Sequence, residues 1–558
     1  MRAVPRPAVK TAGEFSIDTA MAMRVKATRD TEAAMDILVI NTGGTISSFG
    51  HPLAPMSAEA FASAAERHLS KAVAARFPDL ILTYATELRF PTSANGLLDS
   101  TNLQPADWCR IAAFLLEHYA AYDGFIVLHG TDTMAHTASA LPFLLNVFDA
   151  EGFGAAMLSK PVVLTGSQVP MFAHTEKGEA GEVALQFNTD AFQNYCAALA
   201  AMRLGLTEVC VAFGGKLLRG PRAMKTDTKR FEAFSSPNTP ALAEFGTATT
   251  LHEAEIRPGP FRSDLSLDNP SARQVALAHC HAIAGRIDQC LVMPFTVFPA
   301  AFDQAAGSAV LADMIQACLD RELKGLVLLA FGAGNLPSGD PDDPTQGAVY
   351  RVLKAASDTG LVVVDATQVH AGQVALASYA AGAWLPQVGA LSAGDMTAVC
   401  AVTKLTLLLA SAPDRGWDAR TVKALFQRSL CGEMRSLGCL DGRINPVLLP
   451  SHSLATADGS AALENDPISG LRLVDGHGAV LWTPEVPPGR LVIRQDGRLT
   501  LLGSSDAALW SVGGARESGQ ATALLLDGSA ADGSLRLRLY DYAARETTAV
   551  LFDQSQAA

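Results

Sequence analysis

The sequence predicts an α/β protein with two consecutive domains built on mainly parallel sheets, followed by an all-β repeat module. Three observations support this prediction. Apolar runs alternate with helical patterns from residue 36 onward, a polar segment rich in turn residues divides them near residue 240, and helical periodicity stops near residue 446. Apolar runs without polar alternation are typical of strands buried on both faces of a parallel sheet. At 558 residues, the chain is long enough for several hydrophobic cores.

The first domain is predicted over residues 36–240. Its expected strands alternate with helical patterns, which is the βαβ rhythm of a parallel sheet. The strands are expected at residues 37–41, 81–84, 125–129, 162–166 and 208–213, and the clearest helices at residues 106–119 and 137–147. Residues 1–35 mix charged residues, Pro and Thr without a sustained period, so we expect a disordered tail there.

The second domain is predicted over residues 286–446, after a linker at residues 241–285. The linker is inferred from polar, Pro- and Gly-containing sequence that begins at Ser235. Beyond it the βαβ rhythm returns. Buried strands are expected at residues 289–293, 325–330 and 361–365, and helices at residues 311–321, 345–358 and 394–411.

Residues 455–558 contain short β-type runs separated by Asp-Gly turns. The pattern repeats loosely three times, and the copies close on Trp482, Trp510 and Phe552. Repeated hairpins with a closing aromatic predict a small β-prism or trefoil-like module whose aromatics meet at a shared axis. The middle copy resembles the hairpin of bulb-type lectins, but only Asp496 remains of that family's sugar-contacting pattern. We therefore expect a structural or interaction module, with an unknown partner, rather than a sugar-binding one.

Charge and composition narrow the function. The net charge is −13, with 56 acidic against 43 basic residues, which argues against a nucleic-acid partner. No apolar run reaches the roughly 18 residues of a membrane span, and the start lacks a secretory segment, so we expect a cytoplasmic protein with no membrane contact. The nine cysteines form no CxxC pair and are expected to be reduced rather than bound to zinc.

Two loops at predicted strand ends are the strongest indication of function. Thr42-Gly43-Gly44-Thr45 follows the first strand, and His129-Gly130-Thr131-Asp132-Thr133-Met134 follows the third. Open α/β sheets bind ligands at the carboxyl edge of their strands. Glycine lets the backbone approach a ligand closely, and threonine offers a hydroxyl that can attack or be hydrogen-bonded. The alternative is that Thr45 and Thr131 only cap the helices that follow.

These loops resemble those of the bacterial L-asparaginase family, most closely its cytoplasmic type I branch. Further motifs follow in the family's order: Leu98-Asp99-Ser100-Thr101-Asn102, Leu164-Thr165-Gly166-Ser167-Gln168, Arg219-Gly220-Pro221-Arg222-Ala223-Met224-Lys225 and Gly332-Ala333-Gly334-Asn335. The likeness covers about residues 36–445. It implies hydrolysis of L-asparagine to L-aspartate and ammonia, with no metal and no organic cofactor. Because active sites of the family lie between subunits, a homodimer or homotetramer is expected.

The resemblance also implies roles for individual residues. Thr45 would attack the amide carbon and form an acyl-enzyme, while Thr131, Asp132 and Lys225 form a polar relay that activates a hydroxyl or a water. Backbone N–H groups around Thr131 would hold the oxyanion. For the substrate, Ser100 would anchor the α-carboxylate, Asp132 would face the α-amino group, and Asp99 would line the same loop.

Charged neighbours of these residues have simpler interpretations. His129 precedes its turn on a buried strand, so a structural hydrogen bond is expected rather than general-base catalysis. Lys225 lies in a basic stretch whose other members are expected to be surface charge; these are Arg219, Arg222, Lys229 and Arg230.

One departure from the family leaves the function open. The family places a tyrosine on the mobile loop after the first catalytic threonine, where it helps polarise the nucleophile. Residues 47–55 contain no tyrosine; Leu53 stands nearest its position, and Phe49 and His51 are the other possible substitutes. The alternatives are a glutaminase, an amidotransferase subunit acting on misacylated tRNA, a hydrolase of a bulkier amide, or a catalytically weakened binding or scaffold protein.

Overall fold

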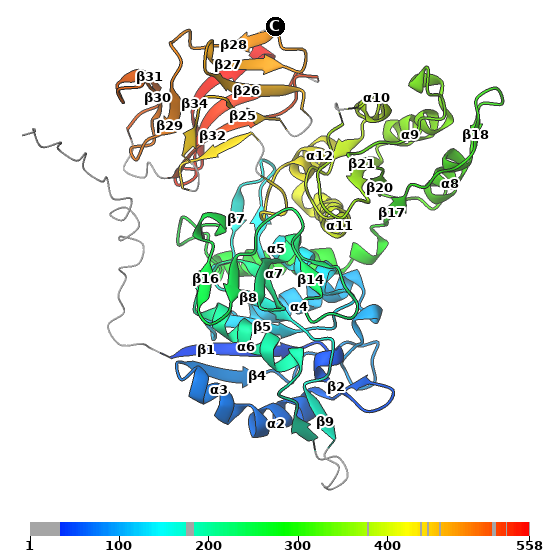
Figure 1. The fold of residues 1–558 in the computed structure, drawn as a ribbon, viewed down its shortest axis with the longest axis vertical. Coiled ribbons are helices and arrows are strands. Elements are labelled where there is room, and N and C mark those ends of the chain that lie inside the picture. The colour runs from blue at the N-terminus through cyan, green and yellow to red at the C-terminus, as the bar shows by residue number, and fades with distance from the viewer. Residues whose placement is uncertain are drawn as a thin grey trace, which may run out of the picture.

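The computed structural model describes residues 34–174, 183–376, 379–435, 438–443, 446–456, 459–515, 521–531 and 533–556. It consists of two α/β domains and a β module, and Figure 1 shows the first domain below the other two. Most of the predicted tail lies outside the described residues, but Met35 already belongs to the first strand. Across the described residues, no helix combines the length and apolarity that crossing a membrane requires.

The first domain is built on an eight-stranded sheet with the order β16-β15-β12-β11-β8-β5-β1-β4. Five neighbouring strands are parallel: β1 (Met35–Asn41), β4 (Leu80–Tyr84), β5 (Gly124–Leu128), β8 (Val162–Thr165) and β11 (Val209–Phe213). Three antiparallel strands extend one edge: β12 (Lys216–Arg219), β15 (Ala243–Phe245) and β16 (Thr249–Leu251). Every residue of β5, β8 and β11 is buried, which confirms the parallel sheet predicted from their apolar runs.

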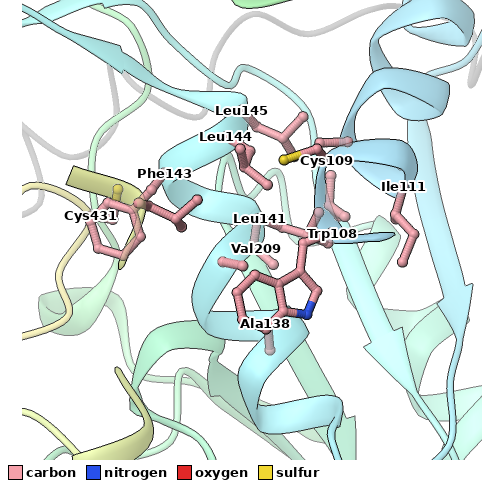
Figure 2. Packing of buried hydrophobic residues seen from close by; sticks show 14 of the residues in the cluster. Trp108, Cys109, Ile111, Ala138, Leu141, Phe143, Leu144, Leu145, Val209 and Cys431 are labelled. Carbon is pink, nitrogen blue, oxygen red and sulfur yellow. The ribbon is translucent and has the colours of Figure 1, made fainter. Parts of the chain in front are cut away.

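Helices cover both faces of this sheet. One face packs against α2 (Ala58–His68), α3 (Ser70–Arg76) and α6 (Asp190–Met202). The other packs against α4 (Pro105–His118), α5 (Met134–Leu145) and α7 (Pro270–Ala284). Figure 2 shows the core between α4 and α5, where Trp108 lies beside Leu141. These helices fix the strand ends from which the two threonine loops project.

The segment 241–285 is not the linker that its composition suggested. Its first part supplies β15 and β16 to the main sheet, and its last part forms α7. Buried α7 residues join the core of the first domain, and Cys280 Sγ lies 3.4 Å from the Leu144 carbonyl oxygen. Polar residues and prolines occupy the exposed face and the turns of this segment. Its average composition is therefore polar, which is why the sequence predicted a linker although α7 packs into the core.

The second domain has a four-stranded parallel sheet with the order β17-β20-β21-β22. Its strands are β17 (Val292–Thr296), β20 (Gly325–Ala330), β21 (Val362–Thr367) and β22 (Leu391–Ser392). The covering helices are α8 (Val310–Leu319), α9 (Ala348–Asp358), α11 (Ala398–Arg415) and α12 (Ala419–Gln427). The strand expected at residues 289–293 begins three residues later and is buried only at Phe295, because β17 is the edge of the sheet and Met293 is 39% exposed.

Short elements complete the two α/β domains. They are β9 (Phe172–His174), β10 (Val183–Leu185), β18 (Phe302–Asp303), β19 (Ser308–Ala309) and α10 (Ala380–Ala383).

Arg219 and Arg222, which were expected to be surface charges, are buried in ion pairs. Arg219 pairs with Glu208 at 2.6 Å, and Arg222 pairs with Asp395 of the second domain at 2.9 Å. Asp395 also accepts the Arg435 backbone N–H at 2.9 Å. Both arginines are therefore structural, and Arg222 joins the two α/β domains.

The β module consists of three four-stranded sheets around one leucine-rich core. It begins at β23, ahead of the predicted boundary at residue 455. Each sheet takes one strand from residues 439–455 and three from a later hairpin repeat, which confirms the threefold pattern. The ring centroids of Trp482 and Trp510 lie 6.1 Å apart, but these rings are only partly buried. Leucines, rather than the predicted aromatic residues, fill most of the buried centre of the module. The strands of the three sheets are β23 (Cys439–Asp441), β32 (Thr522–Asp527), β33 (Arg536–Asp541) and β34 (Glu546–Asp553); β24 (Val447–Leu448), β29 (Arg490–Ile493), β30 (Leu499–Leu502) and β31 (Ala508–Val512); and β25 (His452–Ala455), β26 (Ala461–Asp466), β27 (Gly470–Asp475) and β28 (Val480–Trp482).

Side-chain contacts attach the β module to the first domain. It lies at the hairpin of β6 (Val147–Phe148) and β7 (Gly154–Ala156). The ring of Phe153 stacks on Tyr540 with centroids 3.7 Å apart. Arg538 pairs with Glu151 at 2.9 Å. The module is thus packed on the first domain rather than only tethered to it.

The two threonine loops touch through glycine backbones. Gly44 has φ +85° and ψ 176°, a conformation that is essentially restricted to glycine. A Cβ at Gly44 would lie 2.2 Å from the Cα of Gly130, so the space between the loops excludes even a methyl group. Thr45 and Thr131 each follow one of these glycines directly.

Asp365 is a buried carboxyl without a partner. It lies on β21 with 0% exposure, and among the described residues neither of its oxygens has a hydrogen-bond donor. Burial therefore raises the pKa of Asp365 to about 8.

For the first prediction, we expect Gly44→Ala to destabilise the protein by ~3 kcal/mol or more, because backbone strain of about 1–3 kcal/mol adds to the overlap with Gly130. Gly205→Ala is the matched control, since Gly205 also has a positive φ (+64°) but no atom within 4 Å of the added Cβ. It should cost only ~1–2 kcal/mol. Equal losses in chemical denaturation would contradict the close approach of the loops.

A second prediction concerns pH. The folded protein holds a proton on Asp365 that the unfolded chain releases above about pH 4, so stability falls as pH rises towards 8. Asp365→Asn cannot ionise, and its advantage over the wild type should grow between pH 5 and 8 by up to ~1.4 kcal/mol per pH unit, then level off. The exposed Asp313→Asn is the control. A pH-independent difference in denaturation midpoint would refute a protonated Asp365.

Candidate active site

Thr45 begins a 3-10 turn, Thr45–Ser47, at the carboxyl end of β1. Its side chain is partly exposed, and its hydroxyl makes no hydrogen bond within the described part of the chain. The preceding Thr42 is fixed to β5, because both its N–H and its hydroxyl donate to the Leu128 carbonyl at 2.9 Å. The Thr45 hydroxyl is therefore free to meet a substrate from an anchored turn.

Thr131, Asp132 and Lys225 form one hydrogen-bonded group. Lys225 Nζ donates to Thr131 Oγ1 at 2.8 Å and to Asp132 Oδ1 at 2.7 Å. Thr131 is 7% exposed, whereas the Lys225 side chain is 19% and the Asp132 side chain 56% exposed. A buried hydroxyl thus receives a bond from an ammonium that a half-exposed carboxylate holds in place. This geometry suits proton transfer to or from a hydroxyl, since all three groups lie within hydrogen-bond reach.

The position of Lys225 depends on a short hairpin. β13 (Met224–Lys225) pairs with β14 (Phe234–Ser235), and Lys225 stands opposite Phe234. Phe234 is buried against Phe213 of the central sheet. The lysine therefore reaches Thr131 from a strand anchored in the core rather than from a solvated loop.

His129 has the structural role expected for it. Its Nδ1 lies 2.7 Å from the Gly130 carbonyl and its Nε2 2.8 Å from Thr137 Oγ1, and the ring is fully buried. Burial lowers the pKa of His129 to about 4, so the imidazole is neutral at physiological pH. With both ring nitrogens engaged, His129 supports the turn that carries Thr131.

Ser100 and Asp99 lie beside the Gly130 turn. Ser100 is buried, and its hydroxyl approaches Gly130 so closely that a Cβ on the glycine would lie 2.5 Å from Ser100 Oγ. The Thr133 hydroxyl donates to the Ser100 carbonyl at 2.7 Å, which fixes the loop. Asp99 is exposed and accepts the N–H and the hydroxyl of Thr101 at 3.0 and 2.9 Å. Asp99 thus shapes its own turn, while Ser100 is the member that lies against the Gly130 loop.

The segment expected to carry a lid tyrosine is a short hairpin. β2 (Ser48–Phe49) pairs with β3 (Ala54–Pro55). Phe49 packs against the core, His51 is exposed, and Leu53 at the tip is 52% exposed. None of these three side chains supplies the phenol hydroxyl that the family uses.

Asn41 lies beside the candidate site, and the sequence analysis assigned it no role. Asn41 ends β1, is 5% exposed, and accepts the Gly43 N–H on Oδ1 at 2.9 Å. An asparagine at the end of an otherwise apolar strand is the signal that could have identified it.

Within the described residues, no group of three His, Cys, Asp or Glu side chains is placed to hold a metal ion.

Known proteins share this architecture. The family model described as Asparaginase, N-terminal, matches residues 36–257, and the Glutaminase/Asparaginase C-terminal domain matches residues 308–426. The thermostable L-asparaginase from Thermococcus kodakarensis superposes with a TM-score of 0.52 at 26% identity, covering 72% of this chain and 100% of that structure.

Curated relatives agree at the level of sequence. L-asparaginase 1 of Escherichia coli K12 is 32% identical over 338 residues, which is 61% of this chain and 82% of that protein. A glutamyl-tRNA(Gln) amidotransferase component of Aeropyrum pernix is 33% identical over 349 residues, 60% of this chain and 67% of that protein. The contacts among Thr131, Asp132 and Lys225 therefore occur within a shared fold, and the chain belongs to the asparaginase family of amidohydrolases.

Proposed function

We propose that the protein hydrolyses L-asparagine to L-aspartate and ammonia through an acyl-enzyme on Thr45. The observation that carries the proposal is the position of Lys225 Nζ between Thr131 Oγ1 and Asp132 Oδ1. Thr131 and Asp132 lie on the Gly130 loop, which touches the Thr45 turn at Gly44. The relative from Escherichia coli is named an L-asparaginase. The free hydroxyl of Thr45 supplies the nucleophile, and the hydrogen-bonded group of Thr131, Asp132 and Lys225 supplies a route for its proton.

The residues divide the reaction between them. Thr45 Oγ1 attacks the side-chain amide carbon, and backbone N–H groups around Thr131 stabilise the oxyanion. The proton lost by Thr45 passes to the amide nitrogen, and collapse of the tetrahedral intermediate then breaks the C–N bond and releases ammonia. Water, activated by the group of Thr131, Asp132 and Lys225, then attacks the Thr45 ester and frees aspartate. Ser100 anchors the substrate α-carboxylate, and the exposed carboxylate of Asp132 faces its α-amino group.

Other amides are the alternative. The Aeropyrum pernix relative is named as part of an amidotransferase, so the same scaffold serves more than one amide. With no tyrosine on the β2–β3 hairpin, a glutaminase or a hydrolase of another amide is the second candidate, and a weakened binding protein is the third. The net charge of −13 disfavours a tRNA substrate.

The module adds structure rather than sugar binding. Asp496, its one residue of the lectin pattern, accepts the Arg498 N–H at 3.2 Å and pairs with the Arg498 side chain at 3.4 Å. Its carboxylate is thus occupied within its own turn. We assign residues 439–556 a structural or interaction role.

We also propose a homodimer or homotetramer. The second domain exposes apolar side chains along its edge strand and on neighbouring elements, including Met293, Phe298, Phe302 and Met314. Exposed apolar side chains gathered on one side of a domain are typical of a subunit interface.

A third prediction tests the activity. Purified protein should release ammonia from L-asparagine faster than from L-glutamine or D-asparagine, and Thr131→Ala should lower kcat by ~10²–10⁴-fold because the proton relay is lost. Thr359→Ala, the same change on the exposed end of α9, is the control. Faster release from L-glutamine would move the function to the glutaminase alternative. Release from none of the three would move it to another amide or to binding.

A fourth prediction tests the assembly. Light scattering should give twice or four times the chain mass of 58.5 kDa. Adding charge at Met293 and Met314 should reduce that mass, whereas Ile468→Lys on the module, where Ile468 is 88% exposed, should leave it unchanged. A monomer in the wild-type protein would contradict the proposal.

A further inference from the structure

We infer that Asn41 is a positioning residue for the nucleophile: its side-chain amide holds the turn that presents Thr45. Asn41 is the last residue of β1 and lies opposite Leu128 of β5. Its Oδ1 accepts the Gly43 N–H at 2.9 Å. This inference rests on the proposed role of Thr45 and extends it to the residue that fixes the Thr45 backbone.

The turn is anchored on both sides of Gly43. Upstream, the Thr42 carbonyl accepts the Leu98 N–H at 3.1 Å. Downstream, the Gly44 carbonyl accepts the Ser47 N–H at 3.1 Å and the Ser48 hydroxyl at 2.7 Å. Between these anchors, Asn41 Oδ1 is the one acceptor for the Gly43 N–H among the described residues. The bond from Asn41 therefore fixes the central peptide of the turn.

The conformation of the turn makes this bond matter. Gly43 has φ +110° and Gly44 has φ +85°. Glycine has many alternative conformations, so two consecutive glycines leave the turn poorly specified unless other contacts hold it. A side-chain acceptor that binds the N–H two residues ahead is a standard way to fix such a turn.

The other polar atom of the Asn41 amide makes no hydrogen bond of its own within the described residues. Asn41 Nδ2 is buried and has no acceptor among the described residues. An apolar side chain would continue the run of Ile37 to Ile40 without that unpaired donor. A local rule broken beside a candidate nucleophile indicates a functional constraint.

Thr45 depends on this constraint because its hydroxyl has no other fixed contact. No hydrogen bond from the described residues holds it, so the backbone of the turn alone sets its place. A displacement of about 1 Å from the attack geometry costs rate far more than affinity. Loss of the Asn41 bond should therefore lower kcat with little change in KM.

The test compares Asn41→Ala with Asn41→Ser. Both remove the carboxamide, but serine keeps an oxygen that can accept the Gly43 N–H and alanine does not. We expect Asn41→Ala to lower kcat on L-asparagine by about 10–100-fold with KM within about threefold, and Asn41→Ser to recover most of that loss. Asn41→Ala should melt at a lower temperature than Asn41→Ser, because only alanine leaves the buried Gly43 N–H without an acceptor, so kcat is compared well below both melting temperatures.

A second readout needs no substrate. Hydrogen exchange of the Gly43 N–H should be at least about tenfold faster in Asn41→Ala than in Asn41→Ser, because only alanine leaves this amide without an acceptor. Absence of ammonia release by the wild type would refute the proposed function, and the exchange rates would still test the bond. Equal exchange in the two variants, or equal kcat values in an active enzyme, would overturn the positioning role.

Discussion

The close approach of Gly44 and Gly130 is the constraint on which the candidate site depends. It brings the ends of β1 and β5 together at one edge of the sheet, and each glycine is followed directly by a threonine. Every other member of the site is placed relative to this contact. Ser100 lies against Gly130, His129 contacts the Gly130 carbonyl in the same turn, and Lys225 reaches Thr131 from a core-anchored hairpin.

Much of the fold could be predicted because the central strands are apolar throughout. The runs at residues 125–129 and 162–166 correspond to strands that are buried along their whole length. Where the environment changes along a strand, the same reasoning fails. β17 has an apolar sequence but lies at an edge, and residues 241–285 have a polar composition although α7 packs into the core. Burial at these places is decided by neighbours that are far away in sequence.

The site was predictable to the extent that it consists of motifs. The resemblance to the asparaginase family placed Lys225 with Thr131 and Asp132, and the structure brings these three residues into contact. Pairings with partners distant in sequence were not predictable. Arg222 lies in a basic stretch and was therefore expected to be a surface charge. Its partner Asp395 is 173 residues away in the other domain, so nothing near Arg222 in the sequence shows the ion pair. The sequence shows Asn41 only as a polar residue at the end of an apolar strand, and its bond to Gly43 could not be predicted because it exists only once the two glycines adopt positive φ.

The strand order of the module has a consequence for how the chain is made. β23 pairs with β32, and the Leu526 N–H donates to the Gly438 carbonyl, so the first strand of the module waits for one more than eighty residues later. During synthesis the two α/β domains can fold while residues 439–455 still lack their partners. The sheet β23-β32-β33-β34 is complete only after β34 has been made, so a chain that stalls before β34 leaves β33 as an unpaired strand edge beside two folded α/β domains.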